Sequence, residues 1–389
     1  MILRFARGLA ALTLFLAISS TQSATAQSQA APAVAAPAVA RSAPDRIPDF
    51  AGLIRRLSDA GGYFNTDNLI SNEQGYQQVL GAMERLGVRG GAYIGVGPDQ
   101  NFTYIARVRP RIAFIVDIRR DNMLQHLMYK ALFARARNRA EFLALWTGRP
   151  VPETIARMTD RPIRQLVAWI DSTPVATESA QRARAIVRDE VQRSGVPLSV
   201  QDLATIGRFH DTFIHEGLSL RFTTTGRAPQ PYYPTLRQLV LEHDADNRMR
   251  GFLVAEEDFQ FLKSMQANNF IVPVTGDLAG PRTLPGITRF LAEITERVSV
   301  LYVSNVEDYL MRDGRFNAYA TSVRALPRDA RAVMIRSYFG SGYGHPEATT
   351  EYHATQLLQS MSTFVADTAF ARPMRYRELV NRNWIPLRR

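Results

Sequence analysis

The 389-residue sequence contains no cysteine. Disulfides, thiolate nucleophiles and cysteine-based zinc sites are therefore excluded, and an ordinary hydrophobic core has to stabilise the fold. Lysine is almost absent as well: only Lys130 and Lys263 occur, so arginine supplies nearly all of the basic residues behind a formal net charge of +11. The arginines are scattered among carboxylates, unlike the clustered basic surfaces with interleaved aromatics of nucleic-acid-binding proteins. We therefore expect no nucleic-acid partner.

Long apolar runs are also missing, so the mature chain is expected to have no transmembrane span. The N-terminal residues 1–26 have the pattern of a secretory signal peptide, because Arg4 and Arg7 precede a short apolar segment and Ala24-Thr25-Ala26 is a small-x-small cleavage site. Retention of this segment as a membrane anchor is the alternative. We expect cleavage after Ala26, a periplasmic or secreted protein, and attraction to an anionic envelope surface through the positive net charge.

The rest of the chain divides into a linker and one α/β domain. Residues 27–46 are rich in alanine and proline, which is typical of a disordered linker. Residues 47–389 alternate helical patterns with the apolar segments "GAYIGVG", "RIAFIVDI", "NFIVPVTGDL", "VSVLYVSNV" and "ARAVMIRSYF". Because residues from about 122 to 262 have only helical patterns, we predict a doubly wound, mostly parallel, Rossmann-like sheet with a large helical insertion.

A glycine-containing turn follows the first predicted strand. Gly95 and Gly97 let the backbone turn sharply and let a ligand approach, and the helix predicted over about 99–108 offers free N–H groups. Asp117 ends the next strand, where an acid can accept hydrogen bonds from ribose hydroxyls. Gln100 stands where the dinucleotide fingerprint has its third glycine, which disfavours NAD and a nicotinamide oxidoreductase. The alternatives are a purely structural turn and an aspartate that caps a helix or pairs with a neighbouring arginine.

This order of motifs resembles the class I S-adenosylmethionine-dependent methyltransferase fold, in which a glycine loop, a ribose-binding acid and a residue near the adenine follow successive strands. The resemblance implies that S-adenosylmethionine is the cofactor. The cofactor-binding residues that it implies are Gly95, Gly97, Gln100, Asn101, Asp117 and Asp277. Ser304 and Asn305, after the fourth strand, are implied to face the transferred methyl group and are the candidate catalytic residues.

The stretches "DNLISNE", "GVGPDQNFTYI" and "DIRRDN" are also similar to a group of bacterial exported proteins of unknown function.

The chain departs from the methyltransferase pattern at Tyr93 and Ile94, where that family usually has an acidic residue, and in the long separation of the second and third strands. His210 and His215 are spaced too far around a helix to share a metal, and G-x-S-x-G is absent, so neither a metal nor a serine-hydrolase site is expected.

Two functions therefore remain. The first is an exported methyltransferase-like protein that transfers a methyl group from S-adenosylmethionine to an unknown acceptor, a reaction for which alignment matters more than a general base. The second is a non-catalytic module on the same fold that binds a small molecule or an envelope partner. Export favours the second, because S-adenosylmethionine is made in the cytoplasm.

Overall fold

Seven strands form one sheet in the order β3-β2-β1-β4-β5-β6-β7. They belong to a computed structural model that describes residues 45–66, 68–228, 230–340, 344–369 and 374–388. The strands are β1 (Ala92–Val96), β2 (Ile112–Asp117), β3 (Ile271–Thr275), β4 (Val298–Ser304), β5 (Arg328–Phe339), β6 (Ala354–Ser360) and β7 (Trp384–Ile385). The first five run parallel, and β6 and β7 are each antiparallel to the preceding strand. The predicted α/β class with a mostly parallel sheet is therefore confirmed.

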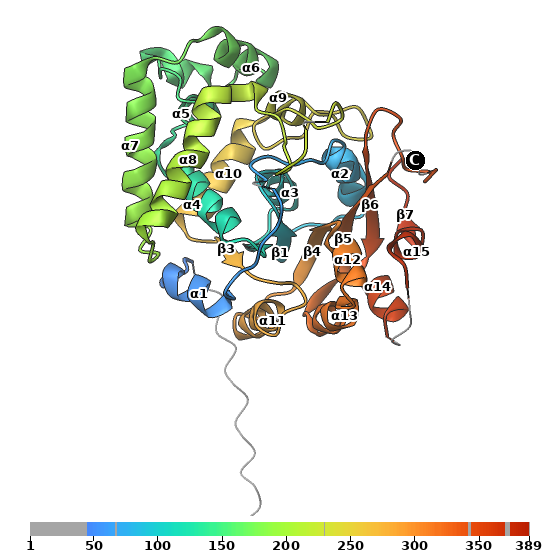
Figure 1. Ribbon diagram of the computed structural model, residues 1–389. Helices are drawn as coiled ribbons and strands as arrows, with labels where there is room; N and C mark the ends of the chain where they lie inside the picture. Colours follow the sequence, from blue (N-terminus) through green and yellow to red (C-terminus); the bar gives the residue numbers. More distant parts are fainter. Residues whose placement is uncertain (1–44, 67, 229, 341–343, 370–373, 389) are drawn as a thin grey trace, which may run out of the picture. The chain divides into compact units, whose positions relative to one another are not determined.

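Helices cover both faces of the sheet, as Figure 1 shows. On one face lie α1 (Phe50–Leu57), α11 (Thr283–Glu293), α13 (Phe316–Ala325) and α14 (Met361–Asp367); on the other lie α2 (Leu80–Arg85), α3 (Gln100–Val108), α4 (Arg120–Arg135) and α10 (Glu256–Ala267). Because both faces are covered, β1 and the apolar part of β2 are buried along their whole length. This burial explains why these strands are continuous apolar runs rather than alternating ones.

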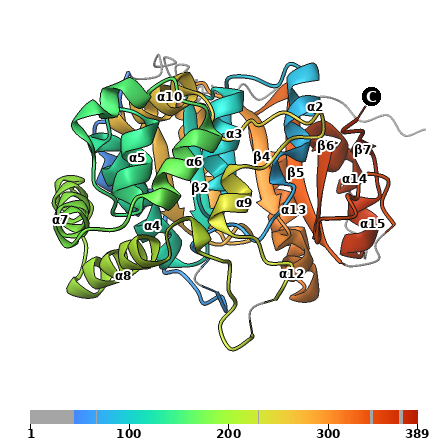
Figure 2. The ribbon, with the colours of Figure 1, turned by 90° about the horizontal axis from the view of Figure 1, so that it is seen from above.

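The chain between β2 and β3 is helical. After α4 it forms α5 (Arg139–Trp146), α6 (Ile163–Ser172), α7 (Thr177–Arg193), α8 (Val200–Glu216) and α9 (Leu236–Val240), with short 3-10 turns at Glu153–Met158 and Gly217–Ser219, before α10. Figure 2 shows α5, α7 and α8 at the end of the molecule opposite β7 and α15 (Tyr376–Val380). Buried aromatic rings attach α5 to its neighbours: Phe142 contacts Phe133 of α4 and Phe259 of α10, and Trp146 contacts Tyr129 of α4. Two isolated bridges, Arg221–Thr235 and His243–Met249, lie outside the sheet.

The described residues belong to one compact unit, Ala40–Arg389. The predicted signal peptide and residues 27–44 of the predicted linker lie outside the described residues. Among the helices in the described ranges, none combines the length and the apolar character that crossing a membrane requires.

Candidate functional site

The register of the parallel strands brings four strand ends to one edge of the sheet. Val96 of β1 pairs with Val116, so the turn at Gly97 follows directly beside Asp117. Asp117 in turn pairs with Thr275, and the Gly276 N–H donates to the Asp117 carbonyl at 2.7 Å. β1 lies between β2 and β4 in the sheet, so the strand order reverses beside β1. The edge at which β1 ends is therefore the topological switch point, where doubly wound sheets bind ligands.

A cavity of about 260 Å³ opens at this edge, and we call it the strand-end crevice. Six of the predicted site residues line it: Gly97, Gln100, Asp117, Asp277, Ser304 and Asn305. Gly95 and Asn101 are not among its lining residues. Residues that the sequence did not single out as site residues also contribute, notably Glu73, Arg119 and Tyr302.

Gly95 and Asn101 build the turn rather than the crevice wall. The fully buried Asn101 amide nitrogen lies within hydrogen-bond distance of the carbonyls of Val96, Gly97 and Pro98 at 2.8 to 3.2 Å, and its side-chain oxygen accepts from the Tyr93 hydroxyl at 2.8 Å. A Cβ at Gly95 would lie 2.1 Å from that oxygen. The expected ligand contacts of these two residues are therefore replaced by contacts within the protein.

Asp117 lies beside the turn, but Arg119 occupies its carboxylate. The Arg119 backbone N–H and Nε donate to Oδ1 at 2.9 and 3.1 Å, and Nη2 donates to Oδ2 at 2.9 Å. Nη1 of the same arginine donates to the Thr66 carbonyl at 2.9 Å, which attaches the loop after α1 to the end of β2. The structure thus contains the arginine pairing that was the alternative for this residue. A carboxylate has about four lone-pair sites, so one further donor can still bind.

Gln100 has an unsatisfied acceptor at the crevice. Its amide nitrogen donates to the Tyr302 hydroxyl at 3.0 Å, while its side-chain oxygen has no hydrogen-bond partner among the described residues. Gln100 is 4% exposed, and buried amide oxygens without partners are uncommon. This oxygen has almost no accessible surface, so a ligand N–H or O–H would reach it only after the Gln100 side chain turns toward the crevice.

Glu73, from the loop before the first 3-10 turn (Tyr76–Val79), is a buried carboxyl group surrounded by uncharged partners. The Ser304 hydroxyl donates to Oε1, and Oε2 accepts from the Ser337 hydroxyl at 2.5 Å and from the Gln356 amide at 3.1 Å. Tyr302 also hydrogen-bonds to it. These partners come from β4, β5 and β6, so only the folded sheet assembles this group.

Because burial outweighs these hydrogen bonds, the pKa of Glu73 is raised above its usual value near 4.5. The folded chain then binds more protons than the unfolded chain from about pH 4.5 up to the raised pKa, and stability falls as the pH rises through this window. Glu73→Gln removes the ionisable group. We expect the variant to gain stability relative to wild type as the pH rises through the window, with the pH-dependent gain absent at lower pH.

Urea denaturation of both proteins at a series of pH values measures this difference. A difference between the two proteins that stays constant with pH would contradict the raised pKa.

Ser304 occupies an unusual backbone position at the end of β4. Its φ of +52° lies in the left-handed region, which side chains other than glycine, asparagine and aspartate seldom adopt, and such strain is concentrated at functional sites. Asn305 precedes α12 (Val306–Arg312), whose Glu307 forms a fully buried ion pair with Arg336 of β5. This ion pair fixes the chain that follows Ser304.

Asp277 completes the crevice from the end of β3. Its Oδ1 accepts from the Ala279 N–H at 2.8 Å, and its carboxylate pairs with Arg315. Among the described residues, the lining contains four acidic residues, Glu73, Asp117, Asp277 and Asp313, and two arginines, Arg119 and Arg315. Even with Glu73 protonated, carboxylates outnumber arginines, so the crevice favours a neutral or cationic ligand.

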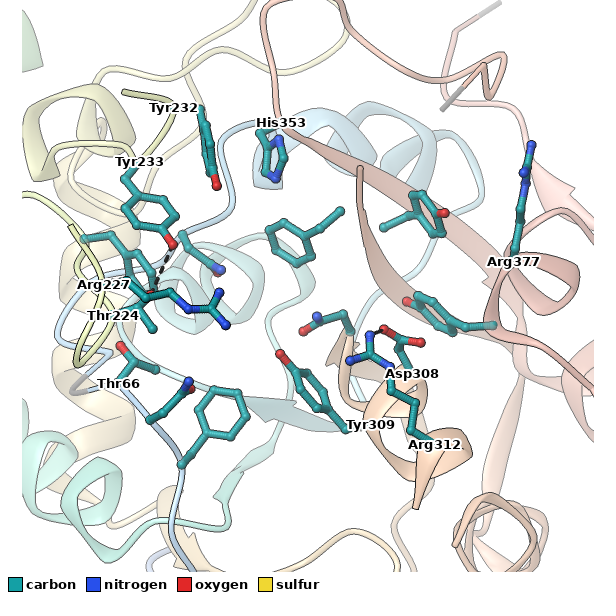
Figure 3. Close-up of a pocket in the computed structure, with 18 of the residues that line it drawn as sticks. Thr66, Thr224, Arg227, Tyr232, Tyr233, Asp308, Tyr309, Arg312, His353 and Arg377 are labelled. Carbon is teal, nitrogen blue, oxygen red and sulfur yellow. Dashed lines mark hydrogen bonds and ion pairs between the residues drawn. The ribbon is translucent and has the colours of Figure 1, made fainter. Parts of the chain in front are cut away.

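A second, larger cavity of about 660 Å³ adjoins the crevice, and we call it the arginine–aromatic cavity (Figure 3). The two cavities have common lining residues: Phe64, Thr66, Asn72, Phe222, Asn305 and Tyr309. Within the described ranges, histidine, aspartate and glutamate form no group of three that could hold a metal ion.

These features define an α/β protein with a crevice at the switch point of its sheet. The chain belongs to the family described as the domain of unknown function DUF7790, whose sequence profile matches residues 68–195 and 221–383. These ranges include every crevice residue named above except Phe64 and Thr66. None of the curated proteins compared with the chain matches it.

Proposed function

We propose that the strand-end crevice binds S-adenosylmethionine and that the protein transfers its methyl group to a small-molecule acceptor. The supporting observation is the meeting of four strand ends, with Gly97, Asp117, Asp277 and Ser304, on one crevice at the switch point of the sheet. We further propose that the protein acts in the periplasm or outside the cell, after removal of residues 1–26.

The residues of the crevice suit parts of this ligand. Gly97, with a φ of +82°, leaves room for close backbone approach, and the unpartnered Gln100 oxygen, once its side chain turns toward the crevice, can accept from an adenine amino group or a ribose hydroxyl. Asp117 has one lone-pair site left for a ribose hydroxyl, and the excess of carboxylates favours a sulfonium cation. S-adenosylmethionine, when bound, supplies an activated methyl group on a positively charged sulfur. Ser304 and Asn305 would position the acceptor, and the Ser304 hydroxyl is held by its hydrogen bond to Glu73.

A second candidate is a non-catalytic module that binds a small molecule or an envelope partner. The observation that favours it is the Asp117–Arg119 ion pair, because both oxygens of the expected ribose acid already have donors from the protein. In this case the crevice would retain a hydroxylated ligand without reaction.

Calorimetric titration of the chain from Gln27 onward with S-adenosylmethionine, S-adenosylhomocysteine and NAD distinguishes these functions. Binding of the first two, in preference to NAD, is expected for the methyltransferase. Absence of heat with all three ligands, in a protein that unfolds cooperatively, would contradict the first proposal and leave the binding module.

Asp117→Ala tests whether the carboxylate contacts the ligand directly. If it does, binding of S-adenosylmethionine should weaken by about 1.5–3 kcal/mol, the contribution of a hydrogen bond to a charged group. Arg119→Gln is the matched variant: it breaks the same ion pair but leaves the carboxylate available, so it should retain binding. Equal losses of stability in both variants, with unchanged ligand affinity in each, would show that Asp117 serves only to pair with Arg119.

A further inference from the structure

The arginine–aromatic cavity is formed by segments that are far apart in the sequence. Its walls come from the loop after α1, the loop before α9, α12, the end of β5 and the start of α15. The loop after α1 contributes Phe64, and the loop before α9 contributes Phe222, Thr224, Arg227, Tyr232 and Tyr233. Its volume of about 660 Å³ is within the range of small-molecule sites. The cavity is therefore a feature of the tertiary fold.

Positive charge predominates in the lining of this cavity. It contains the four arginines Arg227, Arg312, Arg375 and Arg377, whereas Asp308 is its only carboxylate in the described part of the chain. Asp308 pairs with Arg312. Arg227 and Arg375 have no ion-pair partner among the described residues, and Figure 3 shows the Arg227 guanidinium pointing toward the middle of the cavity. A guanidinium group matches the geometry of a carboxylate or a phosphate.

Aromatic rings line the same space. Tyr232 stacks on His353 with a centroid distance of 4.0 Å and an interplanar angle of 25°, and Tyr338 lies nearly parallel to Tyr376 at 5.9 Å. Phe64 and Tyr309 meet edge to face at the boundary with the crevice. Burial lowers the pKa of His353, so its ring is uncharged at neutral pH and contributes an aromatic face. Such walls favour a planar ring over a flexible chain.

We propose that the arginine–aromatic cavity binds a planar aromatic compound that carries a carboxylate or a phosphate group. Its ring would lie against the aromatic walls, with its anionic group on Arg227. Because Asn305 and Tyr309 line both this cavity and the strand-end crevice, the same compound would be the methyl acceptor, a role that rests on the proposed function. The two cavities thus have opposite charge preferences, the crevice for a cation and this cavity for an anion.

The test is calorimetric titration with three naphthalene probes: 1-naphthoate, 1-naphthyl phosphate and the uncharged 1-naphthol. At least one anion should bind more tightly than the neutral probe, and comparison of the two anions identifies the preferred group. Arg227→Gln should weaken binding of the preferred anion about tenfold, because a hydrogen bond between charged groups is lost. Tyr232→Ala, which removes a ring that is 42% exposed, should weaken all probes that bind, with little effect on folding.

Arg182→Gln is the matched control, since this exposed arginine of α7 lines neither cavity. It should leave every affinity unchanged. Binding of 1-naphthol as tight as that of both anions, absence of binding by all probes, or equal effects of Arg227→Gln and Arg182→Gln would each overturn the proposal. A parallel titration with S-adenosylmethionine separates the two proposals: its failure to bind contradicts methyl transfer, whereas the naphthalene results bear on this cavity alone.

Discussion

Replacing Glu307 by alanine is expected to destabilise the protein by about 3–5 kcal/mol, the typical cost of leaving a buried charge without its partner. The Glu307 carboxylate and the Arg336 guanidinium are 0% and 2% exposed as side chains. Nη2 of Arg336 donates to Glu307 Oε1 at 3.2 Å, and Nη1 donates to the Gln359 side-chain oxygen at 2.7 Å. Without Glu307, the arginine would remain between α12 and the sheet with no carboxylate to neutralise it.

Urea denaturation measures this loss, and two further variants check its cause. Asp189→Ala breaks the exposed Arg188–Asp189 pair and should cost no more than about 1 kcal/mol. The double replacement Glu307→Leu with Arg336→Met removes both charges, so it should be less destabilising than Glu307→Ala alone. A single variant as stable as wild type would show that Arg336 finds another partner or reaches solvent.

The Gly97→Val variant is expected to lose ligand binding in the strand-end crevice while the fold is retained. Gly97 has a φ of +82°, and a Cβ there would lie 3.1 Å from the Gln100 amide nitrogen, at the same crevice. The strained backbone should cost about 1–3 kcal/mol of stability. The added side chain should also prevent a ligand from approaching the turn. Calorimetry with S-adenosylmethionine, together with thermal unfolding, measures the two effects separately.

Gly90→Val is the matched control for this variant. Gly90 has a φ of +73°, precedes β1 rather than following it, and has nothing within 4 Å of a Cβ. The strain should therefore lower stability to a similar extent without any effect on affinity. Equal affinity in the two glycine variants and wild type would exclude the turn at Gly97 from the ligand site.

The two antiparallel strands show where prediction from sequence was incomplete. The five parallel strands were predicted as apolar segments, because burial on both faces demands continuous apolar residues. β6, with the sequence "ATQLLQS", and the two-residue β7 were not predicted. The glutamines of β6 are buried, yet they bind polar side chains such as Glu73 and Arg336. A polar residue with a partner across the sheet cannot be distinguished from a surface residue before that partner is known.

Glu73 is the clearest example at the site. It stands in the stretch "DNLISNE", which has the composition of a polar turn, and periodicity cannot reveal a carboxyl group that is buried by a loop. Its partners Ser304, Ser337 and Gln356 lie more than 200 residues further along the chain. The one signal in the sequence was its place in a segment that precedes the first strand, where a loop can close over the carboxyl edge of the sheet.

The sequence by itself determined the α/β class, the parallel strands and the placing of Gly97, Asp117, Asp277 and Ser304 at strand ends, because these depend on local periodicity and on glycine conformation. Only the tertiary structure decided what each side chain contacts. It assigned Asn101 to the turn, paired Asp117 with Arg119 and buried Glu73 among uncharged groups. It also joined an arginine-lined cavity to an acidic crevice. Hydrogen bonding, burial and net charge within a cavity all depend on residues that are distant in sequence, and only folding brings those residues together.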